Sequence, residues 1–182
     1  MKSEAFIELM QQAIRGRNAD DLRKHAFALI AYLVELGYFP ETLFDDLVRL
    51  LKNPDFHSMQ NSFHLVKVLE ESVEYLSIEQ KSALLKSLEE IYPKITDTAS
   101  SLILSELVSG LFPDRRSLET LQRLTKIEND AARALIACGL EQFAKVSKDP
   151  ELVDRAKRQL QAMELDPSEI VRSEARESLA RL

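Results

Sequence analysis

The chain has 182 residues, a formal net charge of −6 and one cysteine. This length predicts a single domain over residues 1–182. One cysteine excludes an internal disulfide and suits a reducing compartment, so we expect a cytoplasmic protein. The acidic balance argues against nucleic acid as a partner. No apolar run approaches the roughly 20 residues of a membrane span, and no secretory hydrophobic segment opens the chain, so we expect no membrane partner.

Clusters of helix-breaking residues divide the chain into ten segments, and all ten show helical periodicity rather than alternation. The breaks fall at residues 16–18, 37–40, 53–54, 76–77, 93–97, 110–114, 128–130, 148–150 and 166–167. The fourth segment, residues 56–75, is expected to form one helix. We therefore predict an all-α fold of about ten helices in five antiparallel pairs. The apolar stripe of the second segment comprises Leu22, Ala26, Leu29, Ile30, Leu33 and Leu36.

Three helix starts carry capping signals. Ser77 and Gln80 form a capping box, in which the hydroxyl and the amide side chain each bond the other residue's backbone N–H. Asp149-Pro150 and Asp166-Pro167 each place an acidic cap before a proline at the first helical position. A proline there loses no hydrogen bond, and the carboxylate suits the positive end of the helix dipole.

One apolar pattern recurs five times along the chain. From each start point the residues three and seven positions on are apolar, and successive start points are 39, 39, 32 and 39 residues apart. These are helical spacings, and a period near 39 corresponds to one helix pair, which must stack on its neighbours to bury its apolar face. The 32-residue step predicts a shortened pair with a tight connection at residues 110–114. The start points are Arg23, Ser62, Ser101, Arg133 and Arg172, and the predicted core includes Leu65, Leu104 and Leu140.

The last copy, residues 166–179, resembles the second-helix pattern of HEAT-like α-solenoid repeats. It has an acidic start, then Val171-Arg172, Ala175 and Leu179, and the stretches around Arg23 and Arg133 are further copies. The resemblance implies a right-handed α–α superhelix of the HEAT and armadillo kind. It also implies that Arg133 and Arg172 each pair with an aspartate of a neighbouring repeat.

The sequence shows no arrangement typical of catalysis or metal binding. His57 and His64 lie seven residues apart on the expected fourth helix, about 10 Å along its axis, which is too far for one zinc ion. Cys138 lies in an apolar helical stretch and is expected to be a core residue. No phosphate-binding glycine loop, nucleophile elbow or zinc spacing is present. We therefore expect no enzyme activity, no metal and no cofactor.

Acidic residues favour the first half of the chain. Residues 1–91 hold 10 Lys and Arg against 15 Asp and Glu, whereas residues 92–182 hold 14 against 15. Clusters occur at residues 45–46, 70–74 and 89–90. This distribution favours a protein partner with a basic surface, attracted over long range. Solubility alone is the alternative interpretation.

The stretch Asp55–Glu70 resembles the signature of small all-helical immunity proteins, which are encoded beside bacterial polymorphic toxins. In that family a methionine, a small residue, His-Leu and a glutamate occur on one helix, followed by a Tyr-Leu turn. The resemblance spans residues 43–146 and implies an inhibitor that binds and occludes a cognate toxin. The matching residues are Met59, Ser62, His64-Leu65, Glu70 and Tyr75-Leu76.

Three functions remain open. The leading prediction is a non-catalytic binding protein, most specifically an immunity protein whose second helices meet a basic toxin surface. The alternative is a HEAT-repeat scaffold or adaptor for another protein complex. The third is a helical-repeat enzyme, such as a DNA glycosylase or a pigment lyase, which the acidic charge and the absence of tryptophan disfavour. The predicted partner contacts are His57, Gln60, Asn61, His64, Lys67, Glu70, Glu71 and Glu74.

Overall fold

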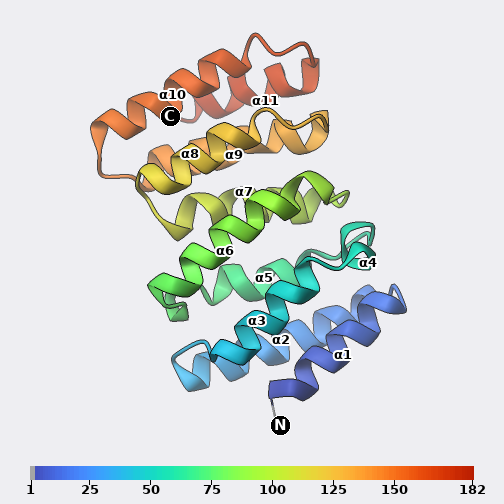
Figure 1. The fold of residues 1–182 in the computed structure, drawn as a ribbon. Helices are drawn as coiled ribbons and strands as arrows, with labels where there is room; N and C mark the ends of the chain where they lie inside the picture. Colours follow the sequence, from blue (N-terminus) through green and yellow to red (C-terminus); the bar gives the residue numbers. More distant parts are fainter. Residues whose placement is uncertain (1–2) are drawn as a thin grey trace. The chain divides into compact units, whose positions relative to one another are not determined.

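The computed structural model describes residues 3–182, which form eleven α-helices and two short 3-10 helices without a strand (Figure 1). The all-α prediction is confirmed. None of the helices in this described part combines the length and the hydrophobicity that a membrane span requires. The helices are α1 (Ser3–Arg15), α2 (Ala19–Leu36), α3 (Glu41–Leu51), α4 (Pro54–His57), α5 (Phe63–Glu71), η1 (Val73–Tyr75), α6 (Ile78–Ile91), η2 (Tyr92–Lys94), α7 (Thr98–Leu111), α8 (Arg115–Leu124), α9 (Asp130–Val146), α10 (Pro150–Met163) and α11 (Glu169–Ala180).

All nine predicted breaks coincide with helix boundaries, and two of the three predicted caps are confirmed. The Gln80 N–H donates to the Ser77 hydroxyl at 3.1 Å, and the Ser77 N–H donates to the Gln80 side chain at 2.9 Å. Asp149 accepts from the N–H of Glu151 at 3.0 Å. The third cap is wrong, because α11 begins at Glu169 and Pro167 lies outside the helix. The Asp166 carboxylate accepts from the Ser168 N–H at 2.8 Å, ahead of the first residue of α11, and it also binds Arg133.

The single helix predicted for residues 56–75 is also wrong. The structure divides this segment into α4, a loop at residues 58–62, α5 and η1. Asn61 adopts a left-handed conformation with φ of 57°, and its N–H donates to Asp97 at 2.9 Å. The Thr96 N–H donates to the His57 carbonyl at 3.0 Å. Because residues 96 and 97 occupy these backbone groups, the helix stops, and His57 and His64 lie on different helices.

Internal contacts divide the chain into two compact units. The first comprises the described residues up to Ser87 together with Lys94–Ile103, and the second comprises Leu88–Pro93 together with Leu104–Leu182. The division falls within α6 and α7. The single domain over residues 1–182 and the right-handed superhelical turn stay predictions.

In the first unit, helices of successive pairs stack on one another. α1 packs against α2 and α3, and α2 packs against α5 (Figure 1). The first helices of the pairs therefore form one layer and the second helices form another, as expected of helical repeats. Apolar side chains fill the space between the layers, among them Met10, Leu22, Leu29, Leu33, Leu47, Phe56 and Leu65.

The second unit repeats this arrangement, with α9 against α8, α10 and α11, and α8 against α10. Leu65 in the first unit and Leu104 and Leu140 here are fully buried, which confirms the predicted repeat positions. The predicted short connection is also confirmed, since only residues 112–114 separate α7 from the ten-residue α8. Ile30 and Leu179, which lie seven residues after the start points of the first and last copies, are only partly buried.

The predicted arginine–aspartate pairing holds for Arg133. Its guanidinium contacts both carboxylate oxygens of Asp166, at 2.9 and 3.0 Å, and this contact lowers the pKa of Asp166. Arg172 instead donates to the backbone carbonyls of Asp166 and Pro167, at 2.8 Å each, so its predicted pairing with an aspartate side chain is wrong.

Candidate functional site

The predicted contact residues do not form one continuous surface, because His57 lies inside the first unit. Its side chain is 8% exposed, and Nε2 donates to the carbonyl of Leu51 at 2.7 Å. Burial lowers the pKa of His57, which keeps the ring neutral. His57 therefore offers little surface to a partner, whereas Gln60 and Asn61 are exposed.

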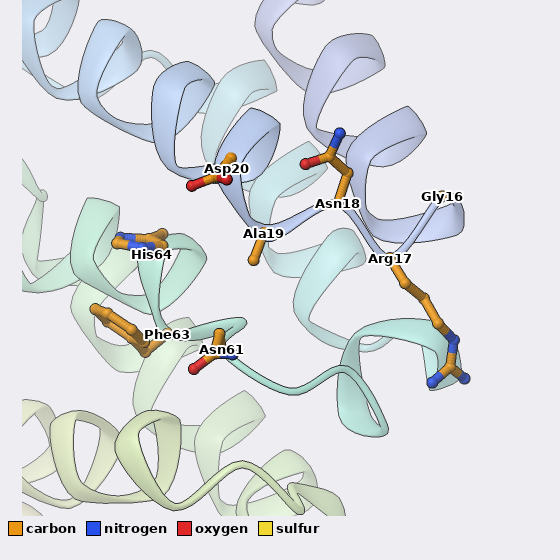
Figure 2. A pocket seen from close by; sticks show the side chains of 8 residues that line it. All are labelled: Gly16, Arg17, Asn18, Ala19, Asp20, Asn61, Phe63 and His64. Carbon is orange, nitrogen blue, oxygen red and sulfur yellow. The ribbon is translucent and has the colours of Figure 1, made fainter.

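Asn61 and His64 lie together at an open hollow of about 580 Å³ between the α1–α2 and α4–α5 connections (Figure 2). The His64 ring lies 4.1 Å from the Phe63 ring, between centroids, and 6.1 Å from that of Phe27. Burial and the charge of Arg23 lower the pKa of His64. The hollow is lined by Gly16, Arg17, Asn18, Ala19, Asp20, Asn61, Phe63 and His64.

Arg17 does not make this hollow an anion site. Figure 2 shows its side chain extending away from Asn61 and His64, and its guanidinium donates to the Ser58 hydroxyl at 3.3 Å. Asp20 also lines the hollow, and Arg23 pairs with its carboxylate at 3.1 Å. The hollow therefore presents Asp20, Asn61 and a neutral His64.

The charged residues of α5 and its continuation are mainly acidic. Lys67 Nζ lies 2.7 Å from Glu70 and 3.6 Å from Glu71, and the hydrogen bond with Glu70 raises the pKa of Lys67. Glu71 and Glu74 are exposed, and a hydrogen bond with Glu74 raises the pKa of Tyr75. We name Glu70, Glu71 and Glu74 the acidic edge. Lys67 is ion-paired with Glu70 and Glu71, and the carboxylates of the exposed Glu71 and Glu74 give this surface its acidic character.

Beside the acidic edge lies a surface that the sequence interpretation missed. Phe27, Val34 and Tyr38 are 60%, 55% and 56% exposed, and Ala31 between them is also exposed. We name these four residues the apolar row. Phe27, Ala31 and Val34 lie on one face of α2 at helical spacing, and Tyr38 lies just after the end of the helix. The sequence did contain a signal of this surface: residues 25–34 include no charged residue and place apolar side chains on every side of the helix.

The apolar row runs along α5 and the acidic edge. Near the start of α2, the Phe27 ring meets His64; past its end, the Phe39 N–H donates to the Tyr75 carbonyl at 3.1 Å. These two contacts align α2 with α5 in the same direction and place Val34 near the level of Glu71. We name the apolar row, His64 and the acidic edge the α2–α5 face.

A second hollow, of about 530 Å³, lies at the far end of the apolar row. Its lining includes Tyr38 and Tyr75, so it continues the row past the end of α2. The α2–α5 face therefore extends between two open hollows, with His64 at one end and Tyr38 at the other. The second hollow is lined by Tyr38, Phe39, Pro40, Glu41, Tyr75, Leu76, Ser77, Glu79 and Gln80.

The groups with potential chemical reactivity are spread out. Cys138 is partly buried, its thiol donates to Glu174 at 3.2 Å, and burial raises the pKa of Cys138 to about 12. A thiol with so high a pKa is a poor nucleophile near neutral pH. Among the residues that the structure describes, no three His, Cys, Asp or Glu side chains are grouped to hold a metal ion.

Comparison with known proteins leaves the family open. No protein-family model and no curated protein matches the chain. Among solved structures, a designed armadillo repeat protein aligns over 96% of this chain and 99% of its own, with 14% identity and a TM-score of 0.35. A likeness at this level assigns no function. The HEAT-like and immunity-protein resemblances stay predictions from the residues quoted above.

Proposed function

We propose that this chain is a non-catalytic protein-binding module that holds a partner protein against the α2–α5 face. The observation that carries the proposal is the apolar row. Its three large side chains are more than half exposed, two of them on α2, which is packed into the first unit, and the third just past the end of α2. Contiguous exposed apolar surface with a polar border is typical of protein-interaction sites.

The acidic edge indicates the charge of that partner. Glu71 and Glu74 are exposed beside the apolar row, and the chain as a whole carries a net charge of −6. A basic partner surface would be attracted over long range and would find its matching charges here. The apolar row would then supply most of the contact energy, because exposed apolar area is removed from water on binding.

The specific form of this function that the sequence favours is an immunity-type inhibitor that occludes a cognate toxin. Of the signature residues, Met59, Ser62 and Leu65 are buried and serve packing. His64 and Glu70 belong to the α2–α5 face, so this part of the resemblance supports partner contact. A toxin whose active region is basic would suit the acidic edge.

A charge-reversal pair tests the proposal. Affinity capture from the native host would identify the partner, and calorimetry with the purified partner would then give its affinity for Glu71→Lys/Glu74→Lys. This variant keeps the ion pair between Glu70 and Lys67. We expect it to bind the partner about tenfold more weakly, or worse. The matched control is Asp154→Lys/Glu177→Lys, which makes the same change in net charge on α10 and α11.

The control is expected to bind the partner with nearly the wild-type affinity. Both variants should unfold within a few degrees of the wild type, because all four positions are exposed. Equal affinities for the wild type and for Glu71→Lys/Glu74→Lys would remove the acidic edge from the binding site. If the partner is a toxin, the same variant should also fail to protect cells from it.

A further inference from the structure

We infer that the element of the partner that docks here is a basic amphipathic α-helix lying along the apolar row. This inference rests on the proposed function and names the chemistry of the partner at that same face. It depends on the shape of the row, on the absence of hydrogen-bonding side chains at Phe27, Ala31 and Val34, and on the distribution of charge around the row.

The row has the dimensions of a helix–helix contact. Phe27 and Val34 are seven residues apart on α2, which corresponds to about 10 Å, or two turns, of helix, and Tyr38 extends the row past the helix end. Ala31 lies between the larger Phe27 and Val34, so the surface alternates between ridge and depression. A partner helix can place its large side chains into such depressions, as packed helices do.

The chemistry of the row disfavours an extended segment. The side chains of Phe27, Ala31 and Val34 have no hydrogen-bond donors or acceptors, and the backbone of α2 is engaged within the helix. A strand lying on these residues would bury its own N–H and C=O groups without partners, at a substantial free-energy cost. A helix satisfies its backbone internally and presents only side chains to the row.

The charges around the row set the composition and the orientation of that helix. Along the second half of the row, Glu35 and Glu41 on the α2–α3 side and Glu71 and Glu74 on the α5 side are exposed. At the start of α2, Arg23 and Asp20 pair at 3.1 Å. Lysine or arginine residues that flank the apolar stripe of the partner should therefore lie near Val34 and Tyr38 rather than near Arg23.

The test uses a defined probe. A fluorescein-labelled 18-residue peptide of leucine and lysine, patterned as an amphipathic helix, is titrated with the protein and followed by anisotropy. The comparison peptides are a scramble of the same composition and a leucine–glutamate helix of the same pattern. The protein variant is Ala31→Arg, which places bulk and positive charge in the middle of the row, and the matched control is Ser173→Arg, at an exposed position of α11.

We expect saturable one-to-one binding of the leucine–lysine helix, with weaker binding of the scramble and none of the acidic helix. Ala31→Arg should weaken binding by about tenfold or more, and Ser173→Arg by less than about twofold. Amide chemical-shift changes should concentrate on α2 and α5. Absence of saturable binding, or equal binding by the wild type and Ala31→Arg, would overturn the inference, as would equal affinity for the scramble.

Measurements with the natural partner separate this inference from the proposed function. If Glu71→Lys/Glu74→Lys loses the partner while Ala31→Arg keeps it, protein binding stands and the helix along the apolar row is wrong. If both variants keep wild-type affinity, the α2–α5 face is not the docking surface and both proposals fall. Loss in both variants, together with binding of the leucine–lysine helix, supports both.

Discussion

Two histidines of the first unit have lowered pKa values for related reasons. For His57 the main cause is burial, which the hydrogen bond to the Leu51 carbonyl partly offsets. For His64 burial again dominates, and the neighbouring charge of Arg23 acts in the same direction. His57 thus stabilises the end of α3 from inside, whereas His64 presents a neutral ring to the α2–α5 face.

The first prediction concerns pH and His57. Because its pKa is lowered in the folded protein, the unfolded chain takes up a proton first as the pH falls. The stability contributed by the neutral ring is fully present above about pH 6.5 and declines as the pH falls from there toward the folded pKa. Urea unfolding at about pH 7.5 and about pH 5.5 should show a smaller loss of unfolding free energy for His57→Gln than for the wild type. Equal losses in the two proteins would contradict this assignment.

Asp97 determines where Asn61 and His64 lie. Its carboxylate is 5% exposed and accepts from the Asn61 N–H and from both the N–H and the hydroxyl of Ser100, at 2.7–2.9 Å. These bonds join the loop at residues 58–62 to the start of α7. The stretch from His57 to Ser62, which is polar except for Met59, was an available turn signal, since Ser and Asn compete with the helix for backbone hydrogen bonds.

At the scale of elements, Gly139 on α9 permits a close approach to α7. A Cβ at this position would lie 2.7 Å from the Ser105 carbonyl oxygen and 2.9 Å from the Leu121 side chain. Neither neighbour is free to move without disturbing a packed helix. Gly110 on α7 differs, because nothing lies within 4 Å of the corresponding Cβ.

The second prediction compares alanine at these two glycines. Gly139→Ala should lower the free energy of unfolding by about 1–3 kcal/mol, because α7 and α9 must separate. Gly110→Ala should be neutral or stabilising by up to about 1 kcal/mol, because alanine favours the helix. Thermal and urea unfolding of both variants would check the pair. A neutral Gly139→Ala would mean that α9 can shift away from α7 at little cost.

The exposed apolar residues of helix α2 escaped the sequence interpretation for a physical reason. Its residues Leu22, Ala26, Leu29 and Leu33 are buried, as predicted. A helix that is apolar on every side normally lies wholly in a core, so periodicity does not reveal which side a partner covers. α1 and α5 pack against α2 and bury those four residues, but they leave Phe27 and Val34 more than half exposed.

At the scale of the whole molecule, the net charge of −6 and its bias to residues 1–91 affect association. The third prediction is that the association rate constant for the partner falls steeply as salt rises from about 0.05 to about 0.5 M, because salt screens long-range attraction. Stopped-flow measurements should show a shallower salt dependence for Glu71→Lys/Glu74→Lys. The same slope in that variant as in Asp154→Lys/Glu177→Lys would mean that total charge, rather than the acidic edge, steers the encounter.

The sequence by itself determined the helical segments, their breaks and the buried repeat positions, including Leu65, Leu104 and Leu140. These features follow from local hydrogen bonding and from apolar spacing, which neighbouring residues specify. Only the tertiary structure decided that the segment at residues 56–75 is broken, that His57 is buried and that the apolar row faces outward. Each of these depends on groups more than five residues away in the sequence, such as Asp97 for Asn61 and the Leu51 carbonyl for His57. The apolar periodicity of one helix does not predict such contacts, because it reports only on the residues of that helix.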